Sequence, residues 1–154
     1  GIKAFHLAAD GSGEQALLVP AGGSRKPATE ETVASKEHYL KMNGKEVFKF
    51  AVTVIPDTVA KTLEKAGMEM KDVDLIVPHQ ANYRIVSAAA KKMDYPEEKF
   101  YMNLNKLGNT SGASIGLALT EAYENGVVKK GDNLVFVGFG AGLSYASLVL
   151  KWAY

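Results

Sequence analysis

The sequence of 154 residues contains no cysteine. This absence excludes a disulfide framework and a zinc site built on thiolates, and it leaves no thiol to act as a nucleophile. It is compatible with a reducing compartment, and we expect a cytoplasmic protein. A strong charge of one sign is lacking too, because the formal net charge is +1. We therefore expect no nucleic-acid partner, and any basic surface must be local.

No apolar run reaches the length of about 20 residues that a membrane span needs. The start of the chain also lacks the charged, apolar and small-residue order of a signal peptide, so we expect no membrane contact. The chain begins at Gly1 rather than Met, which leads us to expect a piece of a longer protein. With 47% hydrophobic and 23% charged residues, residues 1–154 can form a single domain with its own core.

The first part of the chain predicts a hairpin followed by a loop. Residues 2–7 and 16–19 have the apolar character of strands, and a turn signal at 10–13 lies between them. Residues 20–35 are rich in Gly, Pro and Thr and predict an irregular loop. Residues 1–35 are thus expected to lead into the rest of the domain.

Beyond residue 44, helices and strands alternate. Apolar residues at helical spacing predict a helix over 44–66, which Pro56 should end or kink and Gly67 should stop. Further along, the sequence predicts a buried strand at 74–77, a helix at 82–93, a polar loop at 108–114, a helix at 115–123, a central strand at 133–137 and an antiparallel last strand at 143–152. This order predicts an α/β fold with a mixed sheet and helices packed on its faces.

Two loops carry the residues best suited to chemistry. The first is Val-Pro-His-Gln-Ala-Asn at 77–82, where a strand ends and a helix begins. Sites in α/β sheets form at such strand ends. The partial positive charge of a helix start disfavours a protonated imidazole, so His79 is expected to be neutral and able to donate one hydrogen bond. The alternative is a structural histidine that bridges loop and core.

The second loop is Gly-Asn-Thr-Ser at 108–111, which again leads into a helix. Asn109 offers an uncharged amide donor, and a plain helix cap is the alternative. If His79 and Asn109 converge on one oxygen, they form a charge-neutral pair that stabilises an enolate. Neutral donors favour the enolate that develops when a malonyl thioester loses its carboxylate, whereas a cation would retard that loss.

These two motifs, together with Gly-Phe-Gly-Ala-Gly at 138–142, resemble β-ketoacyl-acyl-carrier-protein synthase III in order and spacing. The likeness covers essentially the whole chain. It implies the C-terminal half of a thiolase-like fold, whose two similar halves stack in α/β/α/β/α layers. It also implies a Cys-His-Asn triad in which His79 and Asn109 are catalytic and the cysteine lies on an absent N-terminal half.

The resemblance implies a decarboxylating Claisen condensation of an acyl-CoA with malonyl-acyl-carrier protein, the first step of bacterial fatty-acid synthesis. The coenzyme A thioester and phosphopantetheine would be substrates, so no cofactor is expected. No metal is expected either, because the three histidines lack ligand spacing. The chain alone should be inactive. Expected partners are the missing N-terminal half, the acyl carrier protein and a second copy in a homodimer.

Further site residues follow from the same resemblance. In the glycine-rich run at 138–142, the backbone N–H groups of Gly140 and Ala141 are expected to form part of an oxyanion hole. The alternative for this run is a tight turn between two strands. Positions near the coenzyme A and pantetheine tunnel are matched by Met42, Gly44, Phe48, Asn82 and Phe139.

The resemblance also implies a docking surface for an acidic carrier protein, which a local group of basic residues would provide: Arg84, Lys91, Lys92 and Lys49. A solvated basic helix face is the alternative. Two other functions also stay open. One is a non-catalytic module that binds a carrier protein or pantetheine, and the other is part of a polyketide- or quinolone-type condensing enzyme of the same fold.

Overall fold

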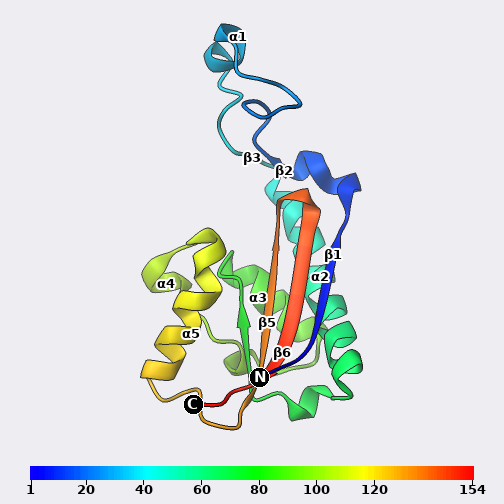
Figure 1. Ribbon diagram of the computed structural model, residues 1–154, viewed down its shortest axis with the longest axis vertical. Coiled ribbons are helices and arrows are strands. Elements are labelled where there is room, and N and C mark those ends of the chain that lie inside the picture. The colour runs from blue at the N-terminus through cyan, green and yellow to red at the C-terminus, as the bar shows by residue number, and fades with distance from the viewer.

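The computed structural model describes all 154 residues and contains a four-stranded sheet with helices on both faces. The segment from β2 to β3 projects from this body, with α1 at its far end, and both termini lie at the opposite end (Figure 1). The helices and strands are β1 (Ile2–Ala9), β2 (Leu17–Leu18), α1 (Glu30–Ala34), β3 (Lys41–Met42), α2 (Gly44–Ala66), β4 (Leu75–Pro78), α3 (Tyr83–Lys92), α4 (Leu104–Leu107), α5 (Ser114–Glu124), β5 (Asn133–Gly140) and β6 (Ser144–Lys151).

The main sheet has the strand order β1-β6-β5-β4 and is mixed, as predicted. Strand β4 pairs in parallel with β5, whereas β5 with β6 and β6 with β1 are antiparallel. The predicted central strand is confirmed, because β5 is paired on both sides: Leu134 lies opposite Leu75 on β4 and opposite Leu150 on β6.

The predicted hairpin between residues 2–7 and 16–19 is wrong. Strand β1 pairs with β6, with Phe5 opposite Leu148, and β2 pairs with β3. The turn itself exists, and in it the Asp10 side chain accepts a hydrogen bond from the Ser12 backbone N–H at 3.0 Å. That turn directs the chain away from β1 instead of back along it. A strand partner at the other end of the chain leaves no local signal in the sequence.

Helix α2 lies where the apolar period predicted it, and Gly67 closes it in the left-handed conformation with φ of 65°. Pro56 does not end this helix. An interior proline costs about 3 kcal/mol, but full burial of a branched apolar side chain contributes about 1.5–3 kcal/mol. Ile55 and Val59 are both buried on either side of Pro56 and hold the helix on the sheet through this position.

Two apolar clusters hold the helices to the two faces of the sheet. On one face, α2 and α3 pack over Ile76 and Val135. On the other, α5 packs over Leu75 and Leu134. Neighbouring residues of β4 and β5 therefore enter opposite clusters, as the alternation of a strand requires when both faces are buried.

The face of the sheet opposite α2 is exposed along β1. Ile2, Phe5 and Leu7 are 65%, 57% and 69% exposed. With Phe136 and Leu148 they line an apolar hollow of 710 Å³. Contiguous exposed apolar surface of this kind is typical of sites that contact another protein, a membrane or a ligand.

Candidate active site

The two loops predicted to carry chemistry open into one cleft of 760 Å³. His79 reaches it from the end of β4, and Asn109 reaches it from the loop before α5. The other residues predicted for oxyanion stabilisation and substrate binding line the same cleft: Gly140, Ala141, Met42, Gly44, Phe48, Asn82 and Phe139. The structure thus brings these predicted residues together from segments far apart in the sequence.

His79 is half-buried and held on three sides. Its backbone N–H donates to the Val137 carbonyl at 2.8 Å, which continues the ladder between β4 and β5. Its Nδ1 lies 2.6 Å from Ser114 Oγ, and its ring meets Phe139 edge-on with centroids 5.7 Å apart. Burial lowers the pKa of His79 from its ordinary value of 6.5, so the imidazole is neutral near pH 7. Burial is thus a cause of the neutral state that the sequence analysis did not name.

The amide of Asn109 is oriented by its own loop. Its Oδ1 accepts a hydrogen bond from the Ser111 backbone N–H at 2.8 Å. This bond fixes the orientation of the amide, and the Nδ2 hydrogens, which make no hydrogen bond within the chain, stay available as donors. Asn109 is not the N-cap residue of α5, which is Ala113, but its oxygen does accept from the first residue of the 3-10 turn Ser111–Ala113 that leads into α5. A cap-like role of the oxygen and a donor role of the amide nitrogen are therefore compatible.

Gln80 anchors the loop that follows His79 and was not predicted as a site residue. It is 1% exposed. Its Nε2 donates to the carbonyls of Pro78 and Tyr101 at 2.9 and 3.0 Å, and its Oε1 accepts from the Asn103 backbone N–H at 3.0 Å. Its sequence signal was its place in the run at 77–82, close to the end of a buried strand, which does not separate a buried amide from an exposed one.

The glycine-rich bend at 138–142 is partly strand, because its first three residues end β5. The turn to β6 follows, with Gly142 at φ 131°, a conformation that favours glycine. Asp10 fixes this turn through two backbone hydrogen bonds with Leu143, at 2.7 and 2.8 Å. Ala141 therefore lines the cleft from a turn whose position is fixed by hydrogen bonds to Asp10.

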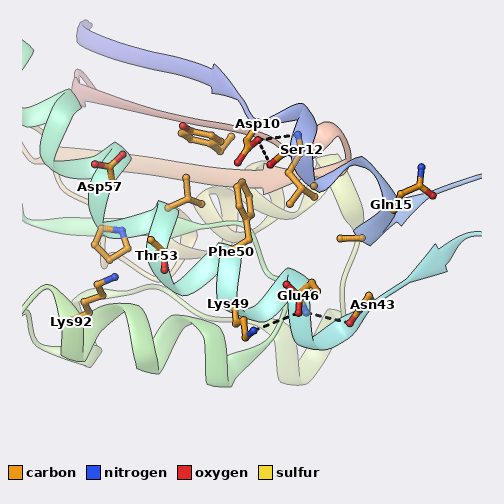
Figure 2. Close-up of a pocket in the computed structure, with 16 residues that line it drawn as sticks. Asp10, Ser12, Gln15, Asn43, Glu46, Lys49, Phe50, Thr53, Asp57 and Lys92 are labelled. Atoms are coloured by element: carbon orange, nitrogen blue, oxygen red, sulfur yellow. Dashed lines mark hydrogen bonds and ion pairs between the residues drawn. The ribbon is translucent and has the colours of Figure 1, made fainter.

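The basic residues lie outside the cleft. Arg84, Lys91 and Lys92 are exposed on α3, and Lys49 is exposed on α2. Lys49 and Lys92 line a second groove of 1010 Å³ along α2, shown in Figure 2. This groove is mixed in charge, since Glu46 also lines it and lies 3.5 Å from Lys49.

The structure contains no group of three or more histidine, cysteine and acidic residues that is placed to hold a metal ion. None of the helices combines the length and the apolar character that crossing a bilayer demands.

The mixed sheet with helices on both faces and the cleft shared by His79 and Asn109 agree with the expected class, the C-terminal half of a thiolase-like fold. The similarity to solved structures given below shows that class. Comparison with known proteins makes this specific. The family described as 3-oxoacyl-[acyl-carrier-protein (ACP)] synthase III C terminal matches residues 63–152. The chain belongs to this family.

Individual relatives agree with this assignment. The chain is 52% identical over 154 residues to the β-ketoacyl-[acyl-carrier-protein] synthase III of Fusobacterium nucleatum, covering 100% of this chain and 47% of the relative. It is also similar to the crystal structure of 3-oxoacyl-(acyl carrier protein) synthase III from Pseudomonas aeruginosa PAO1, with a TM-score of 0.88, 38% identity, and coverage of 99% of this chain and 44% of that chain.

A third likeness is to the priming β-ketosynthase of the R1128 polyketide biosynthetic pathway. The TM-score is 0.84 at 34% identity, over 99% of this chain and 45% of that chain. In each comparison the chain spans about half the length of the relative, and it is a C-terminal fragment of such a protein.

Proposed function

We propose that the chain is the C-terminal part of an acyltransferase that condenses an acyl-CoA with malonyl-acyl-carrier protein. The observation that carries the proposal is the single cleft shared by His79, Asn109 and the turn at Ala141. The acyl group would sit on a cysteine of the missing N-terminal half, because this chain has none. The coenzyme A thioester and phosphopantetheine enter as substrates, and the reaction needs no further cofactor.

The chemistry follows from the two uncharged donors. When the malonyl thioester loses carbon dioxide, the electron pair of the broken C–C bond forms an enolate whose negative charge collects on the thioester oxygen. His79 and the Nδ2 of Asn109 stabilise that charge more than they stabilise the starting thioester, which is what lowers the barrier. The enolate carbon then attacks the acyl-cysteine carbonyl, and the cysteine thiolate leaves.

The pantetheine arm is proposed to follow the apolar wall of the cleft. Met42 and Phe48, which line that wall, are 64% and 37% exposed and so are free to cover an incoming chain. Asn82 caps α3, with its Oδ1 accepting from the Arg84 backbone N–H at 2.8 Å. That bond leaves the Nδ2 of Asn82 available for an amide carbonyl of the arm.

An acidic carrier protein is the proposed macromolecular partner. Arg84 follows the cleft residue Asn82 by two positions, Lys91 and Lys92 continue along α3, and Lys49 lies on α2. Exposed cations of this kind mainly steer association, so their contribution should fade as salt is raised. We propose further that the complete enzyme is a cytoplasmic homodimer.

The proposal is tested by combining this chain with the cysteine-bearing half and following formation of the β-ketoacyl product. We expect condensation to be restored, and we expect His79→Ala and Asn109→Ala each to lower it by about 10²- to 10³-fold. Asn105→Ala, at an exposed asparagine of α4, is the matched control and should keep its activity. The proposal would be overturned if the combined halves bound the carrier protein but showed no turnover, and if His79→Ala and Asn109→Ala left that binding unchanged. That result would favour a non-catalytic binding module.

A polyketide-priming condensation is the second candidate, favoured by the likeness to the R1128 priming β-ketosynthase. It differs from the first candidate in the acyl chain that starts the product, and both need an enolate to be stabilised. The rates of the reconstituted enzyme with a series of acyl-CoA primers separate the two.

A further inference from the structure

Ser114, the first residue of α5, lies against the His79 loop although it was not expected among the site residues. It is 1% exposed. Its Oγ is 2.6 Å from His79 Nδ1 and 3.3 Å from the backbone N of Gln80. These two groups are the only hydrogen-bond partners of the hydroxyl within the chain.

The chemistry of the two partners fixes the direction of both hydrogen bonds. A backbone N–H can only donate, so Gln80 uses a lone pair of Ser114 Oγ. The hydroxyl hydrogen then has one acceptor in reach, the Nδ1 of His79. In the reverse arrangement, with Nδ1–H donating to Oγ, a buried hydroxyl hydrogen would be left without an acceptor, which folded proteins avoid.

We infer that Ser114 is a positioning residue that sets the tautomer of His79. Its Oγ–H donates to Nδ1, so the imidazole hydrogen resides on Nε2, which has no partner within the chain. The Nε2–H is then the donor available in the cleft. Asn109 is prepared in the same way, because its Oδ1 is tied to Ser111 and its Nδ2 is free. The inference rests on the proposed function, since the tautomer matters if His79 must donate to a substrate oxygen.

The tautomer can be observed by ¹⁵N NMR of the full-length enzyme labelled at histidine, with the His79 signals assigned by their absence in His79→Gln. We expect a protonated Nε2 and an unprotonated Nδ1. Ser114→Ala should lose this preference and give a mixture of tautomers. Ser114→Thr keeps a hydroxyl and should keep the Nε2–H form. Ser87→Ala removes a hydroxyl that serves Glu97 instead, and should leave the His79 tautomer unchanged.

Kinetics give the second readout. Ser114→Ala should lower kcat with little change in KM, by less than the about 10²- to 10³-fold expected when a donor is removed outright. A pure Nε2–H form in Ser114→Ala overturns the inference. If that variant does not fold, Ser114→Gly, which also lacks a side-chain donor, is judged by the same criterion. Failure of the proposed function is a separate result, namely full condensation activity in His79→Ala.

Discussion

At the residue scale, the side chains around His79 and Asn109 decide which of their atoms remain available. Ser114 occupies the Nδ1 of His79, and the backbone of Ser111 occupies the Oδ1 of Asn109. What is left is one ring nitrogen and one amide nitrogen on the same cleft. A substitution at a supporting position can therefore alter the chemistry without removing either donor.

Burial of His79 determines whether the stability of the fold rises or falls with pH. Desolvation disfavours the charged ring, so the pKa of His79 lies below 6.5 in the folded state. The unfolded chain then binds a proton at this site at higher pH than the folded chain does. Stability should fall as the pH drops from about 6.5 toward the folded pKa, and this effect is absent above that range. An NMR titration of His79 should have its midpoint below 6.5, and a midpoint at or above that value would contradict the burial argument.

Gln80→Leu should destabilise the fold by about 2–3 kcal/mol, because it leaves buried backbone groups without partners. The groups affected are the Asn103 N–H and the Pro78 carbonyl. Urea unfolding measures the loss. The matched change Gln15→Leu, at an exposed glutamine that bonds only Glu14, should stay within about 0.5 kcal/mol. Equal effects of the two substitutions would show that the buried network is not what holds this loop.

At the element scale, the spacing of apolar residues and the helix stop signals were enough to predict most of the helices and strands. Helices α2 and α3 and strand β5 lie close to their predicted ranges because each buries a face whose spacing is visible in the sequence. The pairing of β1 was not predictable, since its partner β6 is at the other end of the chain. Strands β2 and β3 have two residues each, too few to show any period.

The same limit applies to the site. His79, Asn109 and the glycine-rich bend were found because each forms part of a recognisable run of residues, and the structure places all three on one cleft. Gln80 and Ser114 were missed because their roles depend on burial and on which atom each bonds. Neither the burial of a side chain nor its hydrogen-bond partner can be inferred from residue type or spacing.

The end of α2 gives a prediction at this scale. Gly67 closes the helix at φ 65°, where a side chain costs about 1–2 kcal/mol, so Gly67→Ala should destabilise by that amount. Gly116→Ala in α5 is the matched control, because an added Cβ there meets no atom within 4 Å. It should stabilise by about 0.5–1 kcal/mol through its helix propensity. Urea unfolding of both variants checks the pair, and effects of the same sign would contradict the expectation.

At the scale of the whole molecule, the two faces of the sheet are covered to different extents. Helices α2 and α3 cover one face, whereas α5 covers the other face over β4 and β5 and leaves the apolar residues of β1 exposed. The chain also spans only 47% of its Fusobacterium relative. We expect the missing half to cover these exposed residues.

The isolated chain should therefore self-associate or bind the missing half. The double change Phe5→Ser and Leu7→Ser removes two exposed apolar side chains and should weaken both kinds of contact, as measured by sedimentation velocity. Val33→Ser, 62% exposed on the projecting helix α1 (Figure 1), is the control and should have little effect. A well-behaved monomer with no affinity for the missing half would contradict this.

The most direct test of the two-donor mechanism is the rate of carbon dioxide release from malonyl-carrier protein, measured in the full-length enzyme with its nucleophilic cysteine replaced. This isolates enolate formation from acyl transfer. We expect His79→Ala and Asn109→Ala each to slow the release by about 10²- to 10³-fold, and Asn109→Asp to slow it at least as much, because it sets a negative charge beside the enolate. Unchanged release in the two alanine variants would contradict the claim that these side chains stabilise the enolate.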